Sequence, residues 1–274
     1  MDQEVSPTLF LPADMLSRLV TELDDESVTA ILLHGSYARG EALPPYSDID
    51  LVRILYETPE REQRKQFFWC NGYLVTLSSR PLSLYQEWLK VPQEAIFRIS
   101  SIRDAQILLD KHGSFRRFQQ EACNWKWEAL QEAANAYASQ VMLEQTEIVL
   151  KLLRAFAIHD AVAASEMMLD LFSSLTDAVA VQRGIVIRSG NTYFHQIQQT
   201  IGLNSQWTRY HLRAAGVQTP DAPPPSLEER GMAALHLYRE TFWILQDALQ
   251  AGQKEAIRPL LKMIEDVSAH KNFL

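Results

Sequence analysis

The sequence contains very little cysteine. Cys70 and Cys123 are the two cysteines among 274 residues, and neither belongs to a C-x-x-C pair or lies beside histidines at metal-ligand spacing. Two thiols are too few for a disulfide framework in a chain of this length. The sequence therefore argues against a disulfide-stapled domain and a cysteine zinc site, and favours reduced thiols in a cytoplasm.

Long hydrophobic runs are also missing. No run of about 18 apolar residues occurs in the chain. The first twenty residues contain no basic segment followed by an apolar stretch, which a secretory signal would show. We therefore expect a cytoplasmic protein with neither a membrane-spanning segment nor a standard export signal.

An excess of positive charge is absent as well. Lys and Arg number 26 against 34 Asp and Glu, which gives a formal net charge of -8, and neither half of the chain is basic. A protein that binds polynucleotides without sequence preference neutralises their phosphates with Lys and Arg. The charge balance therefore disfavours nucleic acid as the main partner and fits a small neutral or cationic acceptor.

The composition is that of an ordinary globular protein, with 47% hydrophobic and 22% charged residues, and the length suits two domains. Strand and helix patterns alternate in the first part of the chain, which predicts a mixed α/β domain over residues 1–113. The pattern predicts helices over 12–26, about 58–69 and from Pro81 onward, and strands over 28–33, 48–55 and 72–77.

Beyond about residue 114 the strand signal disappears, and a helical bundle is expected over 114–274. A proline-rich segment, 219–226, cannot be a regular helix and is expected to be a loop or stiff spacer. The bundle segments share helical spacing and are rich in Ala, Leu, Glu and Gln. They are 117–139, 140–159, 161–182 and 227–250.

The chemistry is concentrated in residues 33–51. Gly35 lets backbone N–H groups approach an anion, Ser36 adds a hydroxyl donor, and a helix that starts there favours negative charge. Asp48 and Asp50 are two apart on a strand, so both carboxylates point the same way and need a cation between them. Hard oxygen ligands of this kind suit Mg²⁺, and Arg39 would reach the same phosphates. The segment predicts a metal-bound triphosphate site.

In these residues the sequence resembles the nucleotidyltransferase superfamily, the DNA polymerase beta-like enzymes, whose signature is Gly-Ser followed by Asp-x-Asp. The resemblance covers about residues 28–110. Within the superfamily it is similar to the kanamycin (aminoglycoside) nucleotidyltransferases, through Gly35-Ser36, Arg39 and Tyr46-Ser47-Asp48-Ile49-Asp50. It implies an α/β domain followed by a helical substrate-binding domain, with the active site in a cleft between them.

The resemblance also implies a reaction. A hydroxyl of the acceptor would attack the α-phosphorus of a nucleoside triphosphate, ATP being the expected donor, and pyrophosphate would leave. Asp48 and Asp50 would hold up to two Mg²⁺ ions, while Gly35, Ser36, Arg39 and Ser47 bind the nucleotide. Glu144, with Glu147 as the alternative, would be the general base. The implied acceptor is an aminoglycoside-like small molecule, and the implied assembly is a homodimer.

One position departs from the superfamily pattern. A third carboxylate usually lies on the strand that corresponds to 73–77, and Thr76 occupies that place. Either a single metal ion binds tightly, or Glu87 or Glu144 completes the site, or nucleotide binding remains without transfer. The last alternative describes a nucleotide-binding regulatory or antitoxin-like protein. A further alternative is a nucleotidyltransferase that modifies a protein or an RNA end.

Overall fold

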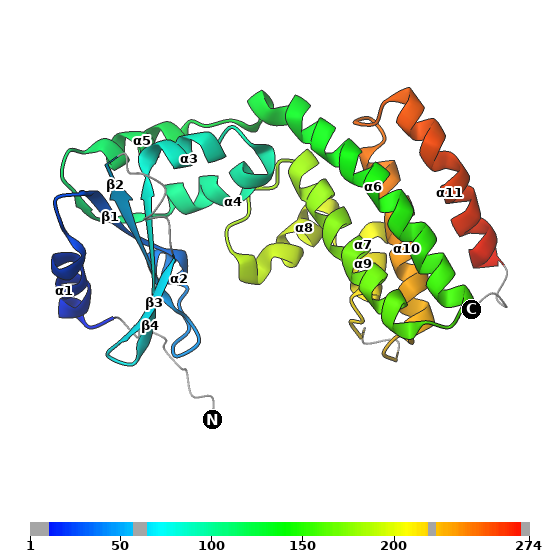
Figure 1. Cartoon of the computed structure of the whole chain (residues 1–274), viewed down its shortest axis with the longest axis horizontal. Coiled ribbons are helices and arrows are strands. Elements are labelled where there is room, and N and C mark those ends of the chain that lie inside the picture. Colours follow the sequence, from blue (N-terminus) through cyan, green and yellow to red (C-terminus); the bar gives the residue numbers. More distant parts are fainter. Residues whose placement is uncertain (1–10, 57–64, 219–222, 270–274) are drawn as a thin grey trace. The chain divides into compact units, whose positions relative to one another are not determined.

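The computed structural model describes residues 11–56, 65–218 and 223–269, and the chain forms two compact units, Met1–Lys126 and Trp127–Leu274 (Figure 1). The boundary predicted from the sequence lies at 113/114, whereas the first unit continues to Lys126. It does so because α5 (Ser114–Cys123) buries Phe115 and Phe118 in this unit. The Phe118 ring, for example, lies 6.5 Å from that of Tyr85.

The first unit is built on a five-stranded mixed sheet in the order β3-β4-β2-β1-β5. β2 and β4 are parallel, and the other neighbouring strands are antiparallel. The strands predicted over 28–33, 48–55 and 72–77 are confirmed. The five are β1 (Val28–His34), β2 (Ile49–Leu55), β3 (Gln66–Cys70), β4 (Tyr73–Pro81) and β5 (Gln106–Asp110).

The two faces of the sheet have different roles. On one face, α1 (Ala13–Leu23) packs Met15 and Leu19 into a core with Leu51 and Leu77 (Figure 1). Successive side chains of a strand point to opposite faces, so Asp50 lies on the other face. Helices α3 (Leu82–Trp88) and α4 (Pro92–Arg103) lie on that side of the sheet. Burial of Leu51 against α1 thus fixes the direction of the neighbouring carboxylate.

One predicted element is wrong in part. The helix expected over 58–69 is a strand from Gln66 onward, and residues 57–64 lie outside the described part. Polar residues at the start of this segment suggested a helix, but the following aromatic residues favour a strand that pairs with β4. The helix expected from Pro81 is confirmed, because Pro81 is the N-cap of α3.

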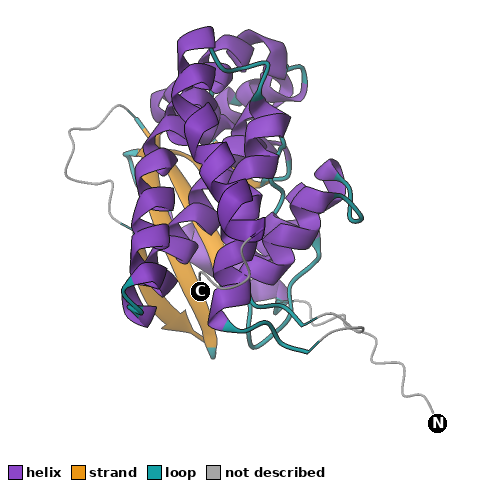
Figure 2. Ribbon diagram, turned by 90° about the vertical axis from the view of Figure 1, so that its right-hand side faces the viewer, coloured by secondary structure: helices purple, strands orange, loops and turns teal. Residues whose placement is uncertain are grey.

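Every regular element described after Lys126 is helical, as expected (Figure 2). None of the described helices is both long enough and apolar enough to cross a bilayer. The elements are η2 (Trp127–Leu130), α6 (Gln131–Ala157), α7 (Ala161–Gln182), η3 (Gly190–Thr192), α8 (Tyr193–Ile201), α9 (Gln206–Ala214), α10 (Leu227–Leu245) and α11 (Ala251–Ala269).

One boundary between the expected helical segments differs from the structure. The break expected at 139/140 does not exist, because α6 runs through it and buries Ala138 and Met142 on one face. In the segment 219–226, expected to be a loop or spacer, residues 219–222 lie outside the described part and residues 223–226 are not helical, as expected. Ser226 caps α10: its hydroxyl accepts from the Glu229 N–H, and the Glu229 carboxylate accepts from the Ser226 N–H.

Candidate functional site

The Gly-Ser turn follows directly on the buried strand β1. Gly35 has φ +69°, in the left-handed region where glycine is unstrained. A Cβ built on it would lie 2.3 Å from Asp50 Oδ2. Helix α2 (Gly35–Arg39) begins here, and the Glu41 N–H donates to the Ser36 carbonyl at 2.8 Å. The backbone of the turn therefore packs against a carboxylate of the Asp-x-Asp element, an approach that a larger residue would prevent.

The two aspartates lie at the start of β2. Asp48 directly precedes this strand and Asp50 is its second residue, so both point to the same face. Between them, Ile49 is fully buried in the core on the opposite face. Asp50 is paired in register with Thr76 of the parallel strand β4, and Thr76 Oγ1 donates to Asp50 Oδ1 at 2.6 Å.

The charge of Asp50 is under opposing influences. Its pKa is raised, mainly because burial disfavours the ionised form, and Asp48 adds to the rise. The hydrogen bond from Thr76 and the positive charges of Lys65 and Arg39 act in the opposite direction. A partly buried carboxylate beside a second one is a place where a bound cation lowers the free energy of the ionised state.

These carboxylates can be tested for their fit to Mg²⁺. Mg²⁺ is usually held by one or two carboxylates together with substrate phosphates and water. Asp48 and Asp50 supply that set for one ion. Within residues 11–56, 65–218 and 223–269, no three His, Cys, Asp or Glu side chains gather as metal ligands. Asp48 and Asp50 thus fit one ion, and Thr76 stands beside Asp50 without the charge of a third carboxylate.

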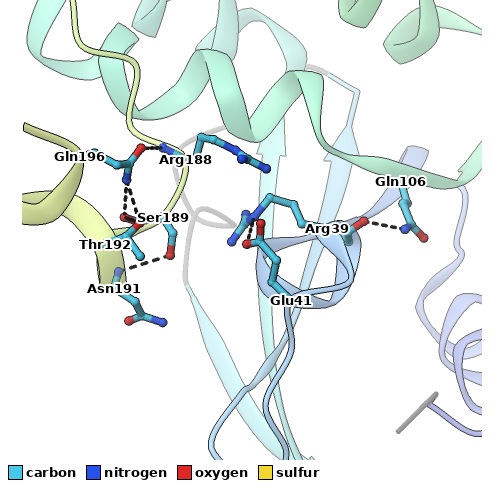
Figure 3. A network of polar contacts seen from close by, with 9 residues as sticks. Arg39, Glu41, Gln106, Arg188, Ser189, Asn191, Thr192 and Gln196 are labelled. Carbon is cyan, nitrogen blue, oxygen red and sulfur yellow. Dashed lines mark hydrogen bonds and ion pairs between the residues drawn. The ribbon is translucent and has the colours of Figure 1, made fainter. Parts of the chain in front are cut away.

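Arg39 and Ser47, predicted to bind the nucleotide, have local partners in the structure. Arg39 Nε donates to Glu41 Oε2 at 2.7 Å, and its side chain is 10% exposed (Figure 3). Ser47 Oγ accepts from the Leu43 N–H at 2.8 Å and so closes the loop before β2. Gln106 Nε2 donates to the Ala38 carbonyl at 2.7 Å. These contacts fix the loops that flank the turn.

The glutamates considered as base or additional ligand are all exposed. Glu144, on α6, accepts from Gln140 Nε2 at 2.8 Å. Glu147 pairs with Lys151 at 2.9 Å and Glu87 with Lys90 at 2.6 Å. Glu87 and Glu147 each pair with a lysine, whereas the side-chain partner of Glu144 is a neutral amide.

A group of side chains on the edge strand β3 was not predicted from the sequence. Phe67 of β3 is paired with Thr76 in register, so it extends the row that contains Asp50. Lys65 Nζ lies 5.1 Å from the centre of the Phe67 ring. Phe67 and Trp69 are 61% and 73% exposed. The aromatic run Phe67-Phe68-Trp69 favours a strand, but the helix expected over 58–69 included these residues, so the strand was not predicted.

In the helical unit, a polar turn precedes α8. The Arg188 N–H donates to Gln196 Oε1 at 3.0 Å, and Gln196 Nε2 donates to Thr192 Oγ1 at 2.8 Å (Figure 3). The Ser189 hydroxyl accepts from the Asn191 N–H at 3.3 Å. This segment is thus ordered by its own hydrogen bonds.

Comparison with known proteins identifies the class. Residues 16–108 match the protein family described as "Nucleotidyltransferase domain". The N-terminal unit thus carries a nucleotidyltransferase domain of the DNA polymerase beta-like superfamily. The match contains the whole segment from Gly35 to Asp50, and the predicted mixed α/β domain is confirmed.

The fold of the whole chain is similar to that of a nucleotidyltransferase-like protein from Exiguobacterium sibiricum 255-15. The TM-score is 0.50 with 11% sequence identity, over 94% of this chain and 91% of that chain. At this identity the likeness concerns the fold alone. No curated protein matches the sequence significantly.

Proposed function

We propose that the chain transfers a nucleoside monophosphate, AMP in the first instance, from a Mg²⁺-bound nucleoside triphosphate to a hydroxyl of a small molecule. The observation that carries this proposal is the close approach of Gly35 to Asp50. It brings the backbone of a phosphate-type turn against the Asp50 carboxylate, as a site that binds triphosphate and metal together requires. The family match over the same residues supports it.

The chain's own residues have distinct tasks in this proposal. Asp48 and Asp50 would hold the metal, which would neutralise charge on the phosphates during transfer. The Gly35 and Ser36 N–H groups and the Ser36 hydroxyl orient the triphosphate, and Arg39 adds positive charge beside it. The acceptor hydroxyl attacks the α-phosphorus, its proton passes to Glu144, and pyrophosphate leaves on the opposite side. Most of the rate enhancement would come from positioning and electrostatics.

A cationic acceptor such as an aminoglycoside-like antibiotic is proposed because of a polar group in the helical unit. Tyr193 donates a short hydrogen bond to Asp177, whose pKa is raised because it is partly buried. Tyr137 lies close enough to Asp177 and Glu144 for both carboxylates to raise its pKa, after burial as the main cause. Two carboxylates and two hydroxyls on one unit complement an acceptor that carries amines and hydroxyls.

The second candidate is a nucleotide-binding protein without transfer activity. It is favoured by one observation, namely that Thr76 stands beside Asp50 where the superfamily usually has a carboxylate. Release of pyrophosphate separates the two candidates. We expect Mg²⁺-dependent release from ATP in the presence of aminoglycosides, absent in Asp48→Asn. Binding of ATP without release, across aminoglycosides and other polyols, would establish the second candidate in place of the first.

A further inference from the structure

Two arginines of the first unit meet at one tryptophan. Arg80 lies near the end of β4, and its Cζ is 4.9 Å from the centre of the Trp88 ring in α3. Arg98, from α4, has its Cζ 4.4 Å from the same ring. The indole attracts each guanidinium, but two like charges around one ring repel each other in a partly buried place. Such a pair is stabilised by an anion.

The positive charge of this cluster is only partly balanced. Arg98 pairs with Glu94, its Nη2 lying 3.0 Å from Oε2. Arg80 Nη2 donates to the neutral Ser78 hydroxyl at 3.2 Å, and no carboxylate of the described residues lies within ion-pair distance of Arg80. Burial is the main cause that lowers the Arg80 pKa, yet a guanidinium stays protonated at neutral pH. Glu94 also acts on Arg80, so one carboxylate faces two guanidiniums.

A buried histidine without a hydrogen-bond partner in the described part of the chain also belongs to this cluster. His34 Nε2 is buried and has no hydrogen-bond partner among the described residues. The His34 pKa is lowered to about 4, mainly by burial and further by the charges of Arg80 and Arg98. The ring lies near both guanidiniums, whose charges act on it. Buried polar atoms nearly always have a partner, so a ligand or water belongs beside Nε2.

The cluster adjoins the carboxylate site on the same sheet face. His34 is paired in register with Asp50. Ser78 follows Thr76 by two residues on β4, so it points to the same face about 7 Å further along the strand. The guanidinium of Arg80 reaches back to Ser78 and hence toward the row of Asp50. An anion held here would lie beside the metal carboxylates.

We infer that Arg80, Arg98 and His34 form a subsite for a phosphate-type oxyanion, with Trp88 holding the two guanidiniums in place. Planar guanidiniums bind phosphate oxygens through paired hydrogen bonds, and the unpartnered Nε2 of His34 can form one more. The inference rests on the proposed function for the source of the phosphate. The bound oxyanion is either a phosphate of the nucleotide donor or a phosphate carried by the acceptor.

Calorimetric titration with inorganic pyrophosphate, without divalent metal and at constant ionic strength, tests the subsite. We expect binding by the wild-type chain that is about ten- to hundredfold weaker in both Arg80→Gln and Arg98→Gln. Arg18→Gln is the matched control, because Arg18 is an exposed arginine of the same unit that pairs with Asp14. Competition by ATP would assign the phosphate to the donor, whereas simultaneous binding would assign it to the acceptor.

Asp48→Asn separates this inference from the proposed function. That variant is expected to lose transfer and to keep metal-free pyrophosphate binding. Pyrophosphate binding that depends on Arg80 in a chain without transfer activity would uphold the subsite and reject the transferase. The inference is overturned if the folded wild type binds no pyrophosphate, or if Arg80→Gln and Arg98→Gln bind it as tightly as Arg18→Gln does.

Discussion

Replacing Gly35 with alanine tests the contact on which the site is built. Gly35 and Gly40 have nearly the same backbone conformation, with φ +69° and +70°. A Cβ on Gly35 would lie 2.3 Å from Asp50 Oδ2, whereas a Cβ on Gly40 meets no atom within 4 Å. Both variants therefore carry the left-handed strain of alanine, about 1 kcal/mol. Only Gly35→Ala also displaces the Asp50 carboxylate.

The size of the additional effect follows from the geometry. Ordinary contact begins near 3.4 Å, so the carboxylate of Asp50 must move by about 1 Å. That movement breaks the 2.6 Å hydrogen bond from Thr76. A hydrogen bond to a charged group contributes about 1.5–3 kcal/mol, and Asp50 regains part of it from water. We expect Gly35→Ala to lower the free energy of unfolding by about 2–3 kcal/mol, against about 1 kcal/mol for Gly40→Ala.

Urea unfolding and titration with Mg²⁺ and ATP measure the two consequences. A carboxylate displaced by about 1 Å is expected to weaken metal-dependent nucleotide binding at least about tenfold, since about 1.4 kcal/mol suffices for that factor. Gly40→Ala should bind as the wild type does. Equal losses of stability and of binding in the two variants would refute the claim that Gly35 is needed for its approach to Asp50.

Three further predictions concern other parts of the chain. Thr76→Asp should lower stability in the absence of Mg²⁺, because the new carboxylate repels Asp50. In a metal titration it should bind Mg²⁺ more tightly than Thr76→Asn does, and equal affinities would contradict this. His211 is buried and its pKa is lowered to about 4, so the unfolded chain takes up its proton first as pH falls below 6.5. The free energy of unfolding should therefore fall by about 2 kcal/mol between pH 7 and 5, and a His211→Gln variant should not show this fall. The same pH dependence in both proteins, measured by urea unfolding, would reject the prediction. Ser226→Ala, which removes one half of the capping box with Glu229, should lower stability by about 1 kcal/mol in the same assay, and an unchanged midpoint would show that the box contributes nothing.

The core of the site was predictable because local sequence determines it. A continuous apolar run predicted β1, and alternation around Ile49 placed Asp48 and Asp50 on one face. The partner strand then brought Thr76 beside Asp50, which the resemblance had anticipated by position. Each of these features depends on the period of a strand or on a short motif.

The cluster of His34, Arg80, Trp88 and Arg98 could not be predicted in this way. Its members come from β1, β4, α3 and α4, and they meet only through the packing of those helices on the sheet. The edge strand with Phe67 was missed for a different reason, because polar residues before it imitated a helix. Its strand conformation depends on pairing with β4, which is a tertiary contact.

The most direct test of the central claim is binding of α,β-methylene ATP, which cannot release pyrophosphate, measured by calorimetry with and without Mg²⁺. We expect binding to require Mg²⁺ and to be weakened at least about tenfold in both Asp48→Asn and Asp50→Asn. Both variants should stay folded, because neither side chain belongs to the buried apolar core. Binding that is independent of Mg²⁺, or unchanged in both variants, would contradict the assignment of the metal site to these two carboxylates.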